Sequence, residues 1–347
     1  MQSLKSNALE PTRSELARLS LPQAIIRLLP IYGLPILALA LAIFFSILLP
    51  DSYPTALNVR SILSDKGIIA LLSLGAMLPM MAGRIDLTIG FGIVMWHILA
   101  ISLQVWYHFP WPLACLVVLV VASVVGLING LLVEVAQIDS FIATLGTGTI
   151  LYALALWHTD GRQVMGHLDP GFVAVNAMRI AGVPMPAIYV LLLALAMWVI
   201  TERLPIGRHI YAIGANEKAA ALNGIPVRAF VIGVFVASGL IAGFTGCVLG
   251  AKLQIGQANV GLDYLLPALV GAFLGTTTIK PGRVNVWGTI VGVLILAIGI
   301  SGIQQLGGAF FVEPMFNGTT LVIAIALAGV AQRRRSVVTS KIEPPSG

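Results

Sequence analysis

The chain carries little charge, almost no cysteine and none of the motifs that nucleophilic or metal catalysis requires. Only 10% of its 347 residues are charged, which is too few to cover a water-exposed surface. Its 14 carboxylates are scattered, and no His-x-x-x-His, Cys-x-x-Cys or Gly-x-Ser-x-Gly pattern occurs. These absences argue against an enzyme, and we expect neither a metal nor another cofactor in this chain.

A nucleotide-binding loop is also missing. No glycine-rich stretch ends in Gly-Lys-Ser or Gly-Lys-Thr, the pattern that cradles a nucleotide phosphate. If ATP drives this protein, we therefore expect ATP hydrolysis on a separate chain. The two cysteines, Cys115 and Cys247, lie in apolar runs, where packing is the ordinary role of a thiol.

Apolar residues dominate what remains. They make up 58% of the chain, and the mean hydropathy is +0.97. A helix of about 20 residues rises roughly 30 Å, which matches the core of a bilayer. Long runs of mostly Leu, Val and Ala lack the alternation of barrel strands. The sequence thus predicts an all-α membrane protein, a polytopic bundle of about 10 transmembrane helices. We place these helices near 31–49, 62–82, 86–104, 112–134, 140–157, 186–202, 229–251, 263–279, 286–304 and 315–331.

The Lys and Arg residues suggest an orientation. With a cytoplasmic N-terminus and ten crossings, five of the 20 basic residues fall outside and the other fifteen inside. Because basic loops stay in the cytoplasm, we expect both termini there. The net charge of +6 then follows from membrane topology, and no nucleic-acid partner is expected. We expect a cytoplasmic tail at 1–30, a transmembrane domain at 31–331 and a second cytoplasmic tail at 332–347.

Glycine recurs at four-residue spacing inside the apolar runs, as at Gly126 and Gly130. Small residues at this spacing share one helix face and let neighbouring backbones approach closely. The pattern predicts a tightly packed bundle. Trp96 and Trp157, near the ends of predicted helices, are expected to anchor at the membrane interface.

The loop 203–228 is the most informative polar segment, because it lies on the basic side between two apolar runs. Its stretch AIGANEKAAALNGI predicts a short helix that begins near Asn216, continues to Leu222 and ends at Gly224. A short helix of this kind suits docking into a groove on a partner, although an ordinary helical connector has the same composition.

Four motifs follow one another in a fixed order along the chain. They are GRIDLTIG at 83–90, GLINGLLVEVAQIDSFIATLG at 126–146, GRHIYAIGANEKAAALNGIPV at 207–227 and GTIVGVLILAIGISGIQQLG at 288–307. Together they resemble the permease subunits of ribose-type monosaccharide ABC importers, and the third is similar to the cytoplasmic coupling segment of that family. The resemblance covers roughly residues 30–331.

The resemblance implies a type II ABC importer permease fold in the inner (plasma) membrane of a bacterium. Such a subunit moves a monosaccharide or similar small polar solute by alternating access. The implied partners are ATP-binding cassette subunits, a periplasmic sugar-binding protein and a second permease subunit, identical or different. The implied ATPase-coupling residues are Gly214, Asn216, Glu217, Ala220 and Gly224. Among them, Gly214 would permit a tight turn, Asn216 would cap a helix and Glu217 would pair with a basic group on the ATPase.

Polar side chains within or beside the apolar runs form a second group of candidates. Asp86 would accept backbone N–H groups where a helix begins, and Arg84 is close enough to pair with it. Each of the others either bonds a neighbouring helix or lines a passage for the solute. The candidates for the translocation pathway are Asp86, Thr88, Asn129, Thr144, Thr147 and Gln254, with Thr149 and Gln304 as further polar positions.

Departures from the family pattern leave the solute open. Thr88 stands where the signature has Ser, and the stretch 271–289 carries threonines in place of a glycine-rich tract. An ion-coupled secondary transporter or a channel for a small solute is the alternative. A proton-coupled carrier usually has a titratable group near the bilayer midplane, whereas the acids here lie near the ends of the apolar runs.

Overall fold

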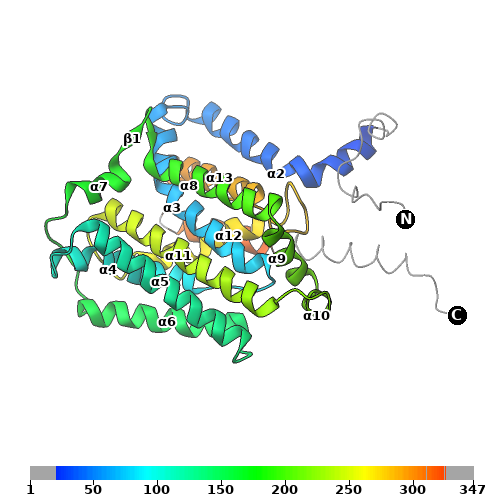
Figure 1. Ribbon diagram of the computed structural model, residues 1–347. Helices are drawn as coiled ribbons and strands as arrows, with labels where there is room; N and C mark the ends of the chain where they lie inside the picture. The colour runs from blue at the N-terminus through cyan, green and yellow to red at the C-terminus, as the bar shows by residue number, and fades with distance from the viewer. Residues whose placement is uncertain (1–20, 310, 324, 326–347) are drawn as a thin grey trace.

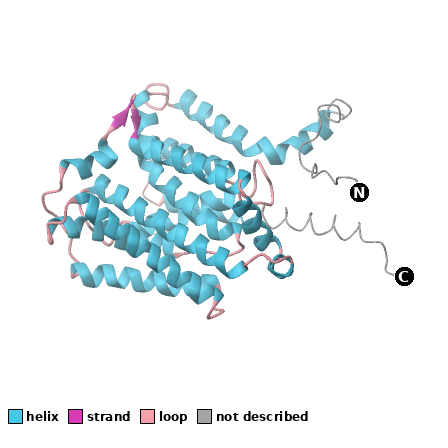
Figure 2. Cartoon of the chain, viewed as in Figure 1, coloured by secondary structure: helices cyan, strands magenta, loops and turns pink. Residues whose placement is uncertain are grey.

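The computed structural model describes residues 21–309, 311–323 and 325, and most of them lie in helices packed side by side (Figure 1, Figure 2). One end of the bundle carries α9 and α10, and the opposite end carries α7 and a small antiparallel hairpin of β1 and β2. The long helices are α2 (Leu21–Leu48), α3 (Ala56–Met81), α4 (Thr88–Val105), α5 (Trp111–Glu134), α6 (Ser140–Thr159), α8 (Met185–Trp198), α11 (Val227–Leu253) and α13 (Val286–Gln305). The shorter elements are α7 (Pro170–Ala177), β1 (Arg179–Ile180), β2 (Val183–Pro184), α9 (Pro205–Ala215), α10 (Glu217–Leu222) and α12 (Leu265–Leu274).

Seven helices within the described residues are long and apolar enough to cross a membrane. They are α3, α4, α5, α6, α11, α13 and α8 together with the π-helical turn Val199–Arg203 that continues it. The prediction of a helical membrane bundle is therefore confirmed, whereas the predicted count of about ten spans is not confirmed by the described residues. A shorter apolar stretch, Tyr32–Leu48, lies in α2, which begins at Leu21, earlier than the predicted start at residue 31.

The predicted helix at 263–279 is wrong in length. α12 has only 10 residues and rises about 15 Å, half of a bilayer core. Its end has a clear cause, because the hydroxyl groups of Thr276 and Thr277 donate to the carbonyl oxygens of Phe273 and Leu274 at 2.7 and 2.8 Å. Side chains that take the last carbonyls compete with the helical ladder. The predicted helix at 315–331 is helical over residues 312–323, and its remainder lies largely outside the described residues.

The core is built around α11, which packs against α5, α4 and α3. A Cβ atom at Gly126 would lie 2.3 Å from the carbonyl oxygen of Phe235, and one at Gly239 would lie 2.4 Å from that of Ala122. Neither glycine could be replaced without moving the α5 and α11 backbones apart. The predicted role of small residues in helix contact is confirmed at this crossing.

Trp96 illustrates the same packing and corrects a prediction. Its side chain is 2% exposed and lies against Gly92 and Gly246, both too close to it for any larger residue. Trp96 is therefore a core residue and not an interfacial anchor. Trp157 is 80% exposed, as an anchor at a membrane surface would be.

Candidate coupling site and the polar network behind it

α9 and α10 form a helical pair at one end of the bundle (Figure 1). Gly207 and Gly214 stand seven residues apart in α9 and therefore lie on one face of it. A Cβ atom at Gly207 would lie 2.2 Å from the carbonyl oxygen of Thr201, and one at Gly214 would lie 2.1 Å from that of Met81. The two glycines let α9 lie directly on the ends of α8 and α3. The expected tight turn at Gly214 is wrong, because Gly214 is helical and serves a backbone contact.

α10 follows the sequence prediction closely. The side chain of Asn216 accepts a hydrogen bond from the N–H of Ala219 at 3.0 Å, so Asn216 caps the helix as predicted. Gly224 has a φ of +79°, which favours glycine, and it stands just past the helix end. Ala220 is buried against the bundle, whereas Leu222 on the same helix is 89% exposed. One side of α10 is thus docked and another side faces outward.

Arg84 ties α10 to the bundle. It lies in the loop 82–87 between α3 and α4, and its Nη2 donates to Glu134 Oε1 at 3.0 Å and to Glu217 Oε2 at 2.8 Å. Glu134 ends α5 and is 2% exposed, whereas Glu217 begins α10 and is 45% exposed. We call these three residues the Arg84 fork. It joins three segments that are distant in the sequence.

The fork bears on two questions about these charges. Asp86 accepts hydrogen bonds from Thr88 and Ser238, whereas Arg84 forms its ion pairs with Glu134 and Glu217, so among the described residues Arg84 does not pair with Asp86. Glu217 has a basic partner inside its own chain, and its expected pairing with a basic group on the ATPase stays a prediction. Burial lowers the pKa of Arg84, but its hydrogen bonds to the two carboxylates outweigh that effect and leave the pKa raised.

A second tie holds α9 to the loop before α13. The hydroxyl of Tyr211 donates to the carbonyl oxygen of Val284 at 2.7 Å, and the guanidinium of Arg283 lies 3.3 Å from the centre of the Tyr211 ring. Burial raises the pKa of Tyr211 to about 12, so the phenol keeps its proton. Lys280, in the same loop, pairs with Glu202 in the π-helical turn Val199–Arg203 that follows α8. The helical pair is therefore fastened to several segments of the bundle.

Five of the six pathway candidates meet in one buried network behind the Arg84 fork. Asp86, which is 2% exposed, accepts from the N–H and hydroxyl of Thr88 and from the Ser238 hydroxyl at 2.8 Å. Thr88 begins α4, so Asp86 bonds the first N–H of a helix, as predicted. Asn129 donates to the Thr88 hydroxyl at 3.1 Å and accepts from the Thr147 hydroxyl at 2.7 Å. This chain of bonds joins α4, α5, α6 and α11.

Thr144 fastens the loop 82–87 to α6. Its hydroxyl oxygen accepts from the N–H of Leu87 at 3.0 Å, and the hydroxyl of Ser140 accepts from the N–H of Ile85 at 3.1 Å. The groups of the network bond one another within the chain, which favours helix contact over solute contact. Gln254, the sixth candidate, lies apart from them at the far end of α11, where it is exposed.

Sequence reasoning missed Glu134, Ser140 and Ser238 as members of this site. Glu134 had a signal, since a carboxylate that ends a long apolar run needs a partner. The two serines had none, because a hydroxyl in a membrane helix commonly bonds its own backbone.

A helical bundle with membrane-length apolar spans, a docked helical pair at one end and a buried polar network behind it defines an integral membrane protein of the transporter class. The chain belongs to the family described as branched-chain amino acid transport system permease components, whose model matches residues 58–329. It is therefore a permease component of a transport system.

Relatives with similarity over nearly their whole length are sugar permeases by name. The chain is 33% identical to a ribose import permease protein of Bacillus subtilis (strain 168) over 319 residues, covering 92% of this chain and 97% of the relative. It is 30% identical to a D-allose transport system permease protein of Escherichia coli (strain K12), covering 84% of this chain and 89% of the relative. A xylose transport system permease protein of the same strain is 27% identical, with 85% and 91% covered. No solved structure matches the chain.

Proposed function

We propose that this chain is the transmembrane permease subunit of an ATP-driven importer for a monosaccharide. The observation that carries the proposal is the similarity over nearly full length to permeases named for ribose, allose and xylose. Although the family description mentions branched-chain amino acids, the three relatives above share a small, uncharged, polyhydroxyl solute. Transport itself is the work of this chain, and ATP hydrolysis takes place on separate ATP-binding cassette subunits.

The assembly we propose has two permease subunits, identical or different, two ATPase subunits and a periplasmic sugar-binding protein. Each permease has the type II importer fold with ten membrane helices and both termini in the cytoplasm of a bacterium. The charges support this orientation. Among the residues whose side chains the structure describes, the α9–α10 end holds seven Lys and Arg residues, namely Arg84, Arg203, Arg208, Lys218, Arg228, Lys280 and Arg283. The opposite end holds five, namely Arg60, Lys66, Arg162, Arg179 and Lys252.

The Arg84 fork suggests how movement enters the bundle. An ATPase that closes on the outer side of α10 would displace Glu217, and Arg84 would carry that displacement into the loop 82–87. From there the hydrogen bonds of Asp86 and Thr144 reach α4, α6 and α11. The two orientations of the bundle would then differ in these contacts, which is what an energy-coupled switch requires. No cofactor in this chain takes part.

Reconstitution tests the proposal. The chain is co-expressed with the ATPase and binding protein of its own transport system, purified and placed in liposomes, and uptake of labelled D-ribose, D-allose and D-xylose is measured with and without ATP. We expect accumulation of at least one sugar that depends on ATP and on the binding protein. Uphill transport by the permease alone on an ion gradient would overturn the proposal in favour of a secondary transporter.

A further inference from the structure

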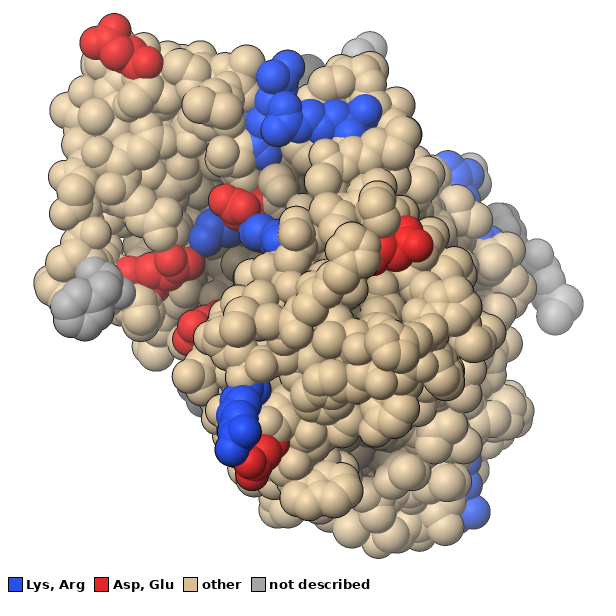
Figure 3. Space-filling view, turned by 90° about the vertical axis from the view of Figure 1, so that its left-hand side faces the viewer, with Lys and Arg blue, Asp and Glu red and all other residues tan. Residues whose placement is uncertain are grey.

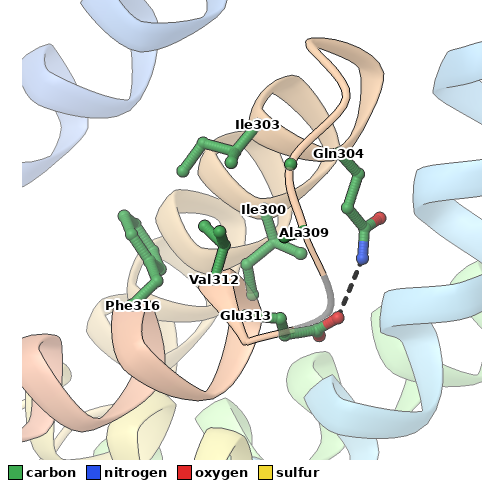
Figure 4. A pocket seen from close by; sticks show the side chains of 8 residues that line it. Ile300, Ile303, Gln304, Ala309, Val312, Glu313 and Phe316 are labelled. Carbon is green, nitrogen blue, oxygen red and sulfur yellow. Dashed lines mark hydrogen bonds between the residues drawn. The ribbon is translucent and has the colours of Figure 1, made fainter.

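A cavity of about 290 Å³ lies between the last turns of α13 and the helical residues 312–323, far from α9 and α10 (Figure 4). Small-molecule sites start at about 300 Å³ and combine apolar walls with a few polar groups. The cavity has this composition. Its apolar side is formed by Ile300, Ile303, Val312 and Phe316, and its polar side by Gln304 and Glu313.

Glu313 organises the polar side. Its Oε2 accepts from Nε2 of Gln304 at 2.8 Å, and its Oε1 accepts from Nζ of Lys66 on α3 at 3.0 Å. A carboxylate oxygen can accept more than one hydrogen bond, and the side-chain amide of Gln304 has two N–H donors and an acceptor oxygen. Acceptors and donors therefore remain for hydroxyl groups of a ligand.

The charges of this side cancel. Lys66 and Glu313 pair with each other, and their side chains are 16% and 34% exposed, so both are partly withdrawn from water. A neutral pair gives little attraction to a free anion or cation. An acyl chain in the cavity would leave the pair facing a group that cannot hydrogen-bond, which is unfavourable. A neutral ligand rich in hydroxyls fits both facts.

Phe316 supplies the opposite wall. A Cβ atom at Gly299 would lie 2.8 Å from Cζ of Phe316, so the tip of the ring lies against the α13 backbone. Aromatic rings offer a rigid apolar face of large area. A monosaccharide has one face of C–H groups and a rim of hydroxyls, which matches an aromatic ring on one side and Glu313 and Gln304 on the other.

Exposed charged side chains lie near the cavity. Asp65, which precedes Lys66 on α3, pairs with Lys252 at the end of α11 at 2.8 Å and is 57% exposed. Figure 3 looks onto this end of the molecule and shows basic and acidic side chains beside one another around a hollow near its middle. In the orientation proposed above, this is the end from which a solute enters.

We propose that this cavity is a monosaccharide subsite on the entry side of the permease, in which Phe316 packs against the sugar ring and Glu313 and Gln304 bond its hydroxyls. The subsite deepens the proposed function, and a role of the subsite in sugar import depends on that function. Binding of a sugar to the purified permease can be measured whether or not the proposed function is right.

Saturation-transfer NMR on the purified permease in detergent micelles, with D-ribose, D-allose and D-xylose as probes, tests the binding directly. We expect transfer to ring protons of at least one sugar, and an affinity about fivefold or more lower for Phe316→Leu and Glu313→Gln. Ile303→Trp, which fills the cavity and keeps its polar groups, should abolish the transfer. Matched controls are Phe109→Leu, an exposed aromatic outside the cavity, and Asp65→Asn, which breaks the neighbouring ion pair; both should leave binding unchanged.

The outcomes separate the two proposals. Equal transfer in the wild type, Glu313→Gln and Ile303→Trp overturns the subsite, and so does the absence of transfer from all three sugars. Either result leaves sugar import by the assembled complex to be judged by the uptake experiment. Transfer that Ile303→Trp abolishes supports the subsite even if the reconstituted complex imports no sugar, in which case the proposed function fails alone.

Discussion

The two ends of the bundle are held together in different ways. At the α9–α10 end, the contacts are backbone against backbone at Gly207 and Gly214, and the Arg84 fork includes a carboxylate that is 2% exposed. At the opposite end, two consecutive residues of α3, Asp65 and Lys66, form separate ion pairs with α11 and with the residues after α13. One end is held in part by close backbone contact, and the other by ion pairs between partly exposed side chains.

This difference matches what each end has to do in an importer. A segment that receives force from a partner must not yield, and glycine-mediated backbone contact yields least because no flexible side chain lies between the helices. An entry that opens and closes needs contacts that break at modest cost, and partly exposed ion pairs are contacts of that kind. The predictions below test the contrast, from the largest expected effect to the smallest.

Gly214→Leu should have the largest effect, because its Cβ atom would lie 2.1 Å from the Met81 carbonyl oxygen and force α9 away from α3. Overpacking of this kind costs about 1–3 kcal/mol or more, and we expect ATP-dependent uptake to fall to about a tenth or less. Uptake in liposomes and co-purification with the ATPase measure it. Gly233→Leu is the matched control, since nothing lies within 4 Å of that position. Equal loss in both variants would show that α9 docking is not the cause.

Arg84→Met should follow, because it removes the cation that pairs with the buried Glu134. Loss of one member of a buried pair costs about 3–5 kcal/mol, and we expect about 2–3 kcal/mol here because Arg84 is 24% exposed. Thermal unfolding in detergent measures the effect. In Arg84→Met with Glu134→Gln, at least half of the lost stability should return. A double variant no more stable than the single one would show that the fork does not hold this end.

Asn129→Ala removes the link between Thr88 and Thr147 and should cost about 1–3 kcal/mol, because a buried hydroxyl and a half-buried one each lose a partner. If the network only joins helices, the sugar concentration for half-maximal uptake stays the same while thermal stability falls. A several-fold rise in that concentration, with stability unchanged, would instead place Asn129 in the translocation pathway. Thr149→Ala is the control, since that hydroxyl bonds the carbonyl of Leu145 on its own helix.

The apolar runs were sufficient to predict most of the long helices. The run 112–134 corresponds to α5 at Trp111–Glu134, because Pro110 and Pro112 mark its start and a carboxylate marks its end. The early end of the helix predicted at 263–279 could not be read from hydropathy, since α12 ends where two threonine hydroxyls bond carbonyl oxygens of its last turn. Hydropathy averages over a window, whereas a cap acts at a single carbonyl.

The coupling site was only half predictable. Asn216 and Gly224 bound α10 through local rules that the sequence displays directly. α9 was missed because Gly207 and Gly214 are typical of loops, although here they serve close packing. The Arg84 fork could not be predicted from the sequence, because Glu134 and Glu217 lie 50 and 133 residues from Arg84 and local patterns carry no information on such pairings.

Lys252→Met should have the smallest effect and completes the comparison of the two ends. It removes the ion pair with Asp65, which is 57% exposed, and pairs of this kind contribute about 0–1 kcal/mol. The thermal midpoint in detergent should therefore change far less than in Arg84→Met, and the small change should vanish as salt is raised, because screening weakens exposed charges first. If Lys252→Met destabilised the protein as much as Arg84→Met, the entry end would be as rigid as the α9–α10 end. A gate could then not depend on breaking this contact, and the closing element would have to be sought among the loops around α7.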